Sequence, residues 1–148
     1  MTEDATLKTA EWVLPVNATS PGIFTSDATG TGQAAAVNQD GSRNTATNPA
    51  TRGSVVSIYA TGEGQTSPPG ETGSVSRSTG TVPLATVTAM IGGSAATERY
   101  AGPSPGSIEG LLQVNAVLPD GVASDPAVPV VVTIGGVPSQ AGVTIAVR

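Results

Sequence analysis

The sequence predicts an all-β domain, a sandwich or a barrel built from eight or nine short strands. Gly, Pro, Thr and Val interrupt the chain too often for a stretch of about 10–12 residues to keep the helical period of 3.6. Short runs of alternating apolar and polar side chains recur instead, and turn-rich segments separate them. The length of 148 residues corresponds to one domain.

The N-terminal third holds three short candidate strands, at residues 12–16, 22–25 and 33–39. Pro15 lies inside the first of them and has no N–H to donate to a neighbouring strand. We therefore expect residues 12–16 to lie at the edge of a sheet.

The middle of the chain holds two stronger strands and one short one. In the run that begins after Gly53 and ends at Gly62, Val, Ile and Ala at positions 56, 58 and 60 alternate with positions 55, 57 and 59. Residues 86–91 alternate in the same way and stop at a Gly-Gly pair, and residues 95–101 form the short candidate.

The C-terminal part holds the clearest strand, residues 111–118, where Gln113 and Asn115 face away from the apolar positions. Residues 128–134 and 143–147 come next and predict a closing hairpin. The apolar sides of these three strands supply the predicted core: Leu112, Val114, Ala116, Leu118, Val130, Val132, Ile134, Val143, Ile145 and Val147.

Turns and loops punctuate these strands. Residues 88–93 and 131–136 each run from a strand into Gly-Gly, which supplies the positive φ angles of a tight hairpin, so we interpret them as one turn used twice. Residues 42–52 and 63–82 form two long polar loops, the second broken by a short strand near Val75. Loops of this length are usually functional or mobile.

The composition excludes several classes of function. The net charge is −5, and the 6 Lys and Arg residues are scattered singly, whereas a nucleic-acid-binding protein needs a basic stripe. No apolar run approaches the roughly 18–20 residues of a membrane span. We therefore expect no nucleic-acid partner and no membrane insertion.

The groups that catalysis needs are scarce. With 0 Cys and 0 His the chain has neither a thiol nucleophile nor the commonest general base and metal ligand. A Ser–Lys pair would depend on Lys8, in the N-terminal segment, and a glycosidase needs two carboxylates facing across about 5–10 Å. We expect no enzymatic activity, no catalytic residues and no cofactor.

Three groups of residues are candidates for binding. One group alternates along the chain as calcium ligands do: Asn38, Asp40 and Ser42, with Asp27 upstream. Asp-Gly at 40–41 favours a hairpin turn instead, so calcium binding is the alternative interpretation. The Gly-rich residues 61–66 lack the lysine of a phosphate-binding loop, and Glu63 would repel a phosphate.

Trp12, Glu63 and Gln65 are the candidate partner contacts. Trp12 is either an exposed anchor for a glycan or protein, or a cover for one end of the sandwich, which we favour. Phe24 is expected in the core.

Several segments, in this order, resemble one family. They are Ser20-Pro-Gly-Ile-Phe-Thr25, residues 32–42, residues 59–66, residues 100–106, residues 110–115 and residues 131–147. They resemble the uncharacterised C-terminal domain of large secreted acidobacterial (Solibacter-type) proteins, an Ig-like domain related to IPT/TIG domains. The resemblance spans residues 15–148 and implies an Ig-like antiparallel β-sandwich of about seven to nine strands, extracellular or at the cell surface. Residues 1–14 would be an N-terminal extension or edge strand.

These expectations lead to three hypotheses of function. The first is a non-catalytic extracellular module that displays, spaces or attaches a larger surface or secreted protein, with a protein or the domains of a parent chain as partner. The second is a self-associating subunit whose N-terminal segment adds a strand to a neighbour. The third is a carbohydrate- or calcium-binding module. The acidic, polar N-terminus is unlike a signal peptide, so we expect a mature or excised piece.

Overall fold

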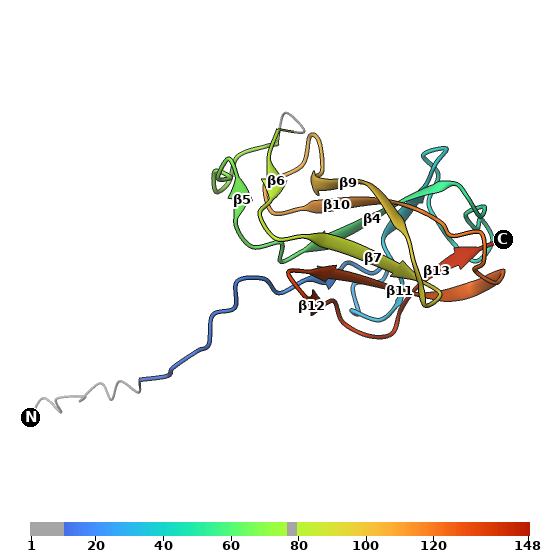
Figure 1. Ribbon diagram of the computed structural model, residues 1–148, viewed down its shortest axis with the longest axis horizontal. Coiled ribbons are helices and arrows are strands. Elements are labelled where there is room, and N and C mark those ends of the chain that lie inside the picture. The colour runs from blue at the N-terminus through green and yellow to red at the C-terminus, as the bar shows by residue number, and fades with distance from the viewer. Residues whose placement is uncertain (1–10, 77–79) are drawn as a thin grey trace, which may run out of the picture.

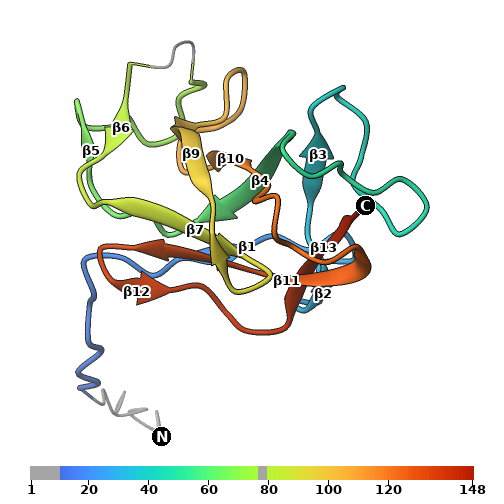
Figure 2. The same cartoon turned by 45° about the vertical axis from the view of Figure 1, so that its right-hand side comes forward.

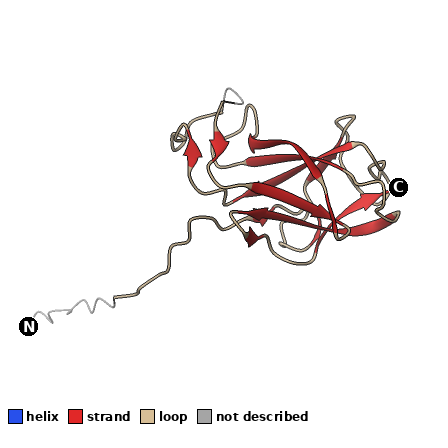
Figure 3. Cartoon of the chain, in the orientation of Figure 1, coloured by secondary structure: helices blue, strands red, loops and turns tan. Residues whose placement is uncertain are grey.

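The fold is an all-β sandwich, as predicted (Figures 1 and 3). The computed structural model describes residues 11–76 and 80–148, which contain thirteen strands and no helix. No membrane-spanning helix is therefore present in these two ranges. Thirteen exceeds the expected seven to nine because two predicted runs, 33–39 and 95–101, each correspond to two strands, and because three two-residue strands form at 66–67, 82–83 and 137–138.

The first sheet has the order β1–β4–β10–β9, and β3 also pairs with β4. All its pairings are antiparallel. Its strands are β1 (Gly22–Ile23), β3 (Ala36–Asn38), β4 (Val55–Thr61), β9 (Thr97–Pro103) and β10 (Leu112–Val117).

The second sheet has the order β2–β13–β11–β7–β8, and β12 also pairs with β11. Its strands are β2 (Gly32–Gln33), β7 (Val87–Ile91), β8 (Ser94–Ala95), β11 (Asp125–Ile134), β12 (Val137–Pro138) and β13 (Val143–Val147). The β11–β13 pairing confirms the closing hairpin. The sandwich is antiparallel, as expected, except that β2 runs parallel to β13 and Ala50 forms a parallel bridge with Val147.

The core lies between the two sheets and is made by alternate residues of each strand. All ten predicted core residues are at most 3% exposed. Ile58, Ile91 and Val56 are fully buried with them, as the alternation in β4 and β7 predicts. Gln113 and Asn115 lie on the other face of β10, where the Gln113 amide donates a hydrogen bond of 2.9 Å to Asn115.

Two predictions for the N-terminal part are wrong. Residues 12–16 form no strand, because no strand of the described ranges pairs with them. Phe24 is 45% exposed, because Ile23 beside it points into the core and neighbouring strand residues face opposite sides. Of the predicted segment 1–14, residues 1–10 lie outside the described residues.

The two Gly-Gly sequences form the same turn, as predicted. Gly92 and Gly93 have φ angles of +59° and +77° and join β7 to β8, while Gly135 and Gly136 have +59° and +84° and join β11 to β12. Two successive residues with positive φ define the hairpin turn that matches the twist of the strands.

The sandwich has two distinct ends, which we call the pocket end and the C-terminal end (Figure 2). At the pocket end β4 and β11 finish, and the chain arrives there: the Ser20 amide donates to the Gly62 carbonyl at 2.9 Å and the Thr19 hydroxyl to the Ile134 carbonyl at 2.9 Å. At the C-terminal end β13 finishes beside Ala50.

The described part of the long polar loop at 63–82 contains more regular structure than the sequence predicts. It contains β5 (Thr66–Ser67) and the start of β6 (Val82–Pro83), which pair to form a two-stranded ribbon at the pocket end. Val75 forms an antiparallel bridge with Ile108, close to the short strand predicted there. The described part of this loop is thereby tied to residues 104–110.

Candidate functional site

The candidate site is a pocket at the pocket end, built around Glu63. The turn between β4 and β5 carries Glu63 and Gln65, two of the three candidate partner contacts, and both line the pocket. The pocket has a volume of about 680 Å³. We call it the Glu63 pocket; its walls are residues 63–67, 69–73, 84 and 108–110.

The turn that carries Glu63 is held by its two neighbouring glycines. Gly62 and Gly64 have φ angles of +81° and +76°, a conformation that residues with a Cβ rarely adopt. The arriving chain crosses directly over them: a Cβ at Gly62 would lie 1.8 Å from the Ser20 carbonyl oxygen, and one at Gly64 2.2 Å from that of Ala18. Backbone packing on both sides therefore sets the direction of the Glu63 side chain.

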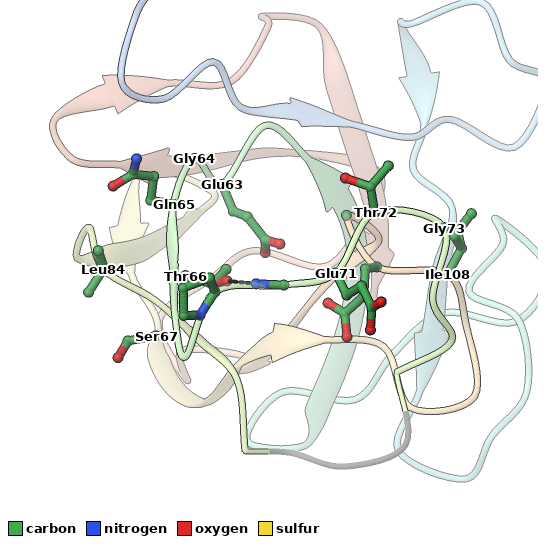
Figure 4. A pocket seen from close by; sticks show the side chains of 14 residues that line it. Glu63, Gly64, Gln65, Thr66, Ser67, Glu71, Thr72, Gly73, Leu84 and Ile108 are labelled. Atoms are coloured by element: carbon green, nitrogen blue, oxygen red, sulfur yellow. Dashed lines mark hydrogen bonds between the residues drawn. The ribbon is translucent and has the colours of Figure 1, made fainter.

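The Glu63 carboxyl group is buried, and one of its oxygens lacks a partner. The residue is only 6% exposed, and its Oε2 atom has no hydrogen-bond partner among the described residues. Figure 4 shows the side chain pointing into the pocket, away from the backbone of the turn. Buried polar atoms are almost always hydrogen-bonded, so an unpartnered carboxylate oxygen calls for an explanation.

The surroundings of Glu63 are acidic. Burial raises the pKa of the Glu63 carboxyl above its usual range, and the negative charge of Glu109 raises it further. Burial also raises the pKa of Tyr100, and the charges of Glu63 and Glu109 add to that shift. Glu71 also belongs to the pocket wall. The described lining residues therefore carry three carboxyl groups and no basic group.

The raised pKa has a consequence for stability. Because the folded protein favours the protonated form of Glu63, this residue stabilises the fold fully below its unfolded-state pKa. That contribution is lost as the pH rises through the higher folded-state pKa. At neutral pH, above the unfolded-state pKa, at least part of this contribution is lost, so the burial of Glu63 destabilises the free protein relative to acidic pH.

The mouth of the pocket carries apolar side chains. Leu84, just after β6, is 64% exposed, and Ile108 is 59% exposed. The wall between them is held by hydrogen bonds within the loop, including one of 3.0 Å from the Gly70 amide to the Thr66 hydroxyl (Figure 4). The site thus combines a buried carboxyl group with an exposed apolar rim.

Trp12 lies elsewhere and covers nothing in the described part of the chain. It is 83% exposed, and the apolar residues that follow it, Val13, Leu14 and Val16, are 95%, 77% and 94% exposed. The prediction that Trp12 closes one end of the sandwich is therefore wrong. In Figure 1 this segment extends away from the two sheets.

The calcium candidates lie in two separate turns, and one carboxylate oxygen of each aspartate accepts hydrogen bonds from its own turn. The Asp40 carboxylate accepts from the amide and hydroxyl of Ser42, and the Asp27 carboxylate accepts from those of Thr29. These bonds lower the pKa of both aspartates. The Asn38 side chain bonds to Asn44 and to the Asn48 carbonyl. The favoured hairpin is present: the Gly41 amide donates to the Asn38 carbonyl at 2.9 Å.

Sequence reasoning found Glu63 and Gln65 but not the pocket. Glu71 and Glu109 come from loops far apart in sequence, and the bridge between Val75 and Ile108 brings those loops together. The one local signal is Gly-Glu-Gly at 62–64, where two glycines force an unusual backbone around a carboxylate.

Comparison with known proteins gives no match: neither a protein-family model nor a curated protein nor a solved structure matches the chain. The acidobacterial family resemblance therefore stays a prediction from the sequence. Within the described residues no group of three or more His, Cys, Asp or Glu side chains is placed to hold a metal ion.

Proposed function

We propose that the chain is a non-catalytic module of an extracellular or cell-surface protein, in which it spaces, displays or attaches neighbouring parts. The observation that carries this proposal is the path of the chain. It reaches the sandwich beside Gly62 at the pocket end and leaves it beside Ala50 at the C-terminal end (Figure 1). A module with this layout holds its two neighbours in a longer protein on opposite sides.

The strand pairing also suits a module under tension. Near the N-terminus β2 runs parallel to β13, and the Ala34 amide donates to the Thr144 carbonyl at 2.8 Å. A pull on the two ends of the chain acts along these strands, so their hydrogen bonds lie across the force and break together. The pairing of β2 with β13 therefore resists separation of the two ends of the chain.

Pulling single molecules between residue 17 and residue 148 tests this role. We expect one abrupt unfolding event that releases about 400 Å, the extended length of the chain between the handles less the folded distance. A handle at Val137 instead of Arg148 places both attachment points at the pocket end, and strands should then peel apart at lower force. Gradual unfolding in small steps between residues 17 and 148 would contradict the proposal.

Self-association is the second candidate function, and the exposed segment 12–16 favours it. Four apolar side chains there are more than three-quarters exposed, and no strand of the described ranges pairs with their backbone. An extended apolar segment of this kind can add itself to the open edge of a sheet in another copy.

Sedimentation velocity over a wide concentration range tests this second function. If segment 12–16 lends a strand, the full chain forms larger species as the concentration rises, and serine substitution of Trp12, Val13 and Leu14 abolishes them. Met90→Ser, which removes an exposed apolar side chain on β7, is the matched control and should assemble normally. A full chain that stays monomeric throughout rules the second function out.

A further inference from the structure

We infer that the Glu63 pocket binds a basic side chain, an arginine or a lysine, presented by a partner polypeptide. This goes beyond the role of a spacer, because it assigns a binding site and the chemistry of its occupant. It rests on three features of the pocket: a buried carboxylate oxygen without a partner among the described residues, further acidic groups around it, and an apolar rim.

The first feature identifies the missing partner as a hydrogen-bond donor. Within the described structure Glu63 Oε2 is buried and has no partner, and the Glu63 side chain points toward the pocket (Figure 4). A guanidinium or ammonium group supplies a donor and a compensating positive charge in one group. Hydrogen bonds between charged partners are also the strongest available to a carboxylate.

The second feature favours a cation over a neutral donor. The described lining contains Glu63, Glu71 and Glu109 and no lysine or arginine. A metal ion is a poorer match, because calcium takes six to eight oxygen ligands and the described carboxylates are not gathered into a group of three. An organic cation needs only one or two carboxylates.

The third feature favours a long side chain over a small free cation. Leu84 and Ile108 are both more than half exposed at the rim. Arginine and lysine have an apolar stem behind a charged head and bury that stem along apolar surface. The carboxyl group in the depth of the pocket would bind the charged head of such a side chain, and the apolar side chains at its mouth would contact the stem. The pocket volume of about 680 Å³ lies within the range of pockets that hold small ligands.

The binding should depend on pH. The cation requires the ionised form of Glu63, so affinity increases as the pH rises through the pKa of that carboxyl. The titratable groups around it are Glu71, Glu109 and Tyr100, all of which are acids. None of them can carry a positive charge that would take the place of the incoming cation.

The experiment is a titration of the ¹⁵N-labelled full chain with N-acetyl-arginine amide, monitored by NMR. We expect shifts at the amides of Gly64, Gly70 and Glu109, and none with N-acetyl-citrulline amide, which has the same shape without the charge. Glu63→Gln should weaken binding about ten- to hundredfold, the loss of one charged hydrogen bond. Glu11→Gln changes the net charge equally but lies in the exposed N-terminal segment, and should bind normally.

Further measurements can overturn the inference. Equal binding by Glu63→Gln and the wild type, or calcium alone causing the same shifts at lower concentration, would show a different site or a different occupant. Arg77 lies outside the described residues. We expect Arg77→Gln to bind N-acetyl-arginine amide as tightly as the wild type does. Much tighter binding would show that the chain's own arginine fills the pocket. Without the probe, Glu63→Gln should melt above the wild type at neutral pH, which establishes that this variant folds.

Discussion

Gly62→Ala is expected to lower the free energy of unfolding by more than about 3 kcal/mol, because two penalties act at one position. The φ angle of +81° alone costs a residue with a Cβ about 1–2 kcal/mol. In addition, the new Cβ would lie 1.8 Å from the Ser20 carbonyl oxygen and 2.4 Å from its carbon. Those are backbone atoms, so no side chain can rotate away to make room.

The clash acts on the contact that attaches the N-terminal chain to the sandwich. The Ser20 amide donates to the Gly62 carbonyl at 2.9 Å, and relief of the clash would separate these two groups. Ser20 leads directly into β1, which pairs with the end of β4. The substitution should therefore loosen the first strand as well as the turn that holds Glu63.

Comparison of the free energies of unfolding of Gly62→Ala and Gly136→Ala in urea separates the cost of the backbone conformation from the cost of the steric clash. Gly136 has a φ angle of +84°, but a Cβ there meets nothing within 4 Å among the described residues. The control therefore reports the backbone conformation alone, about 1–2 kcal/mol. If both variants lose the same stability, the arriving chain does not press against Gly62 and the account of the turn fails.

The sequence predicts a strand best when one face of that strand is apolar and the other is polar. In β4 and β10 apolar and polar residues alternate, so strand and buried face are predicted together, and Ile58 and Val114 are both fully buried. Residues 12–16 show the limit of this reasoning. Their apolar character indicates a strand, but a strand also needs a neighbour to pair with, and sequence carries no record of one.

The candidate site was predicted less well, for a different reason. Gln65 and Glu63 stand out in a Gly-rich turn, but the burial of Glu63 depends on the chain arriving at Gly62 and on the loop that carries Glu109. These contacts join segments more than 40 residues apart in the sequence. Local patterns describe turns and alternation, and they do not record which loops meet.

Asn44 shows the same limit inside a loop that the sequence presents only as polar. The residue is 1% exposed, and its amide is fully used. Its oxygen accepts from the Ala146 amide at 2.8 Å and from Gln33 at 2.9 Å, while its nitrogen donates to the Ala146 carbonyl and to Asn38, both at 2.9 Å. The side chain thus pairs with β13 as a neighbouring strand would.

Asn44→Ala is accordingly expected to destabilise the protein by about 2–4 kcal/mol, measured as the free energy of unfolding in urea. The substitution removes four hydrogen bonds and leaves the N–H and C=O of Ala146 without their side-chain partner in the interior. The Ala50 amide also donates to the Ala146 carbonyl at 2.9 Å, so the group most affected is the Ala146 amide, which donates to the Asn44 oxygen. Its desolvation is then uncompensated.

Asn48→Ala is the matched control for this loop. Asn48 is exposed, and its amide donates to the Ser42 hydroxyl and the Arg43 carbonyl, two groups that water can reach after the substitution. We expect a loss below about 1 kcal/mol, since water replaces hydrogen bonds at an exposed site. Equal losses in the two variants would mean that Asn44 acts as an ordinary loop residue. A much larger loss in Asn44→Ala would establish that one buried amide completes the pairing of the last strand.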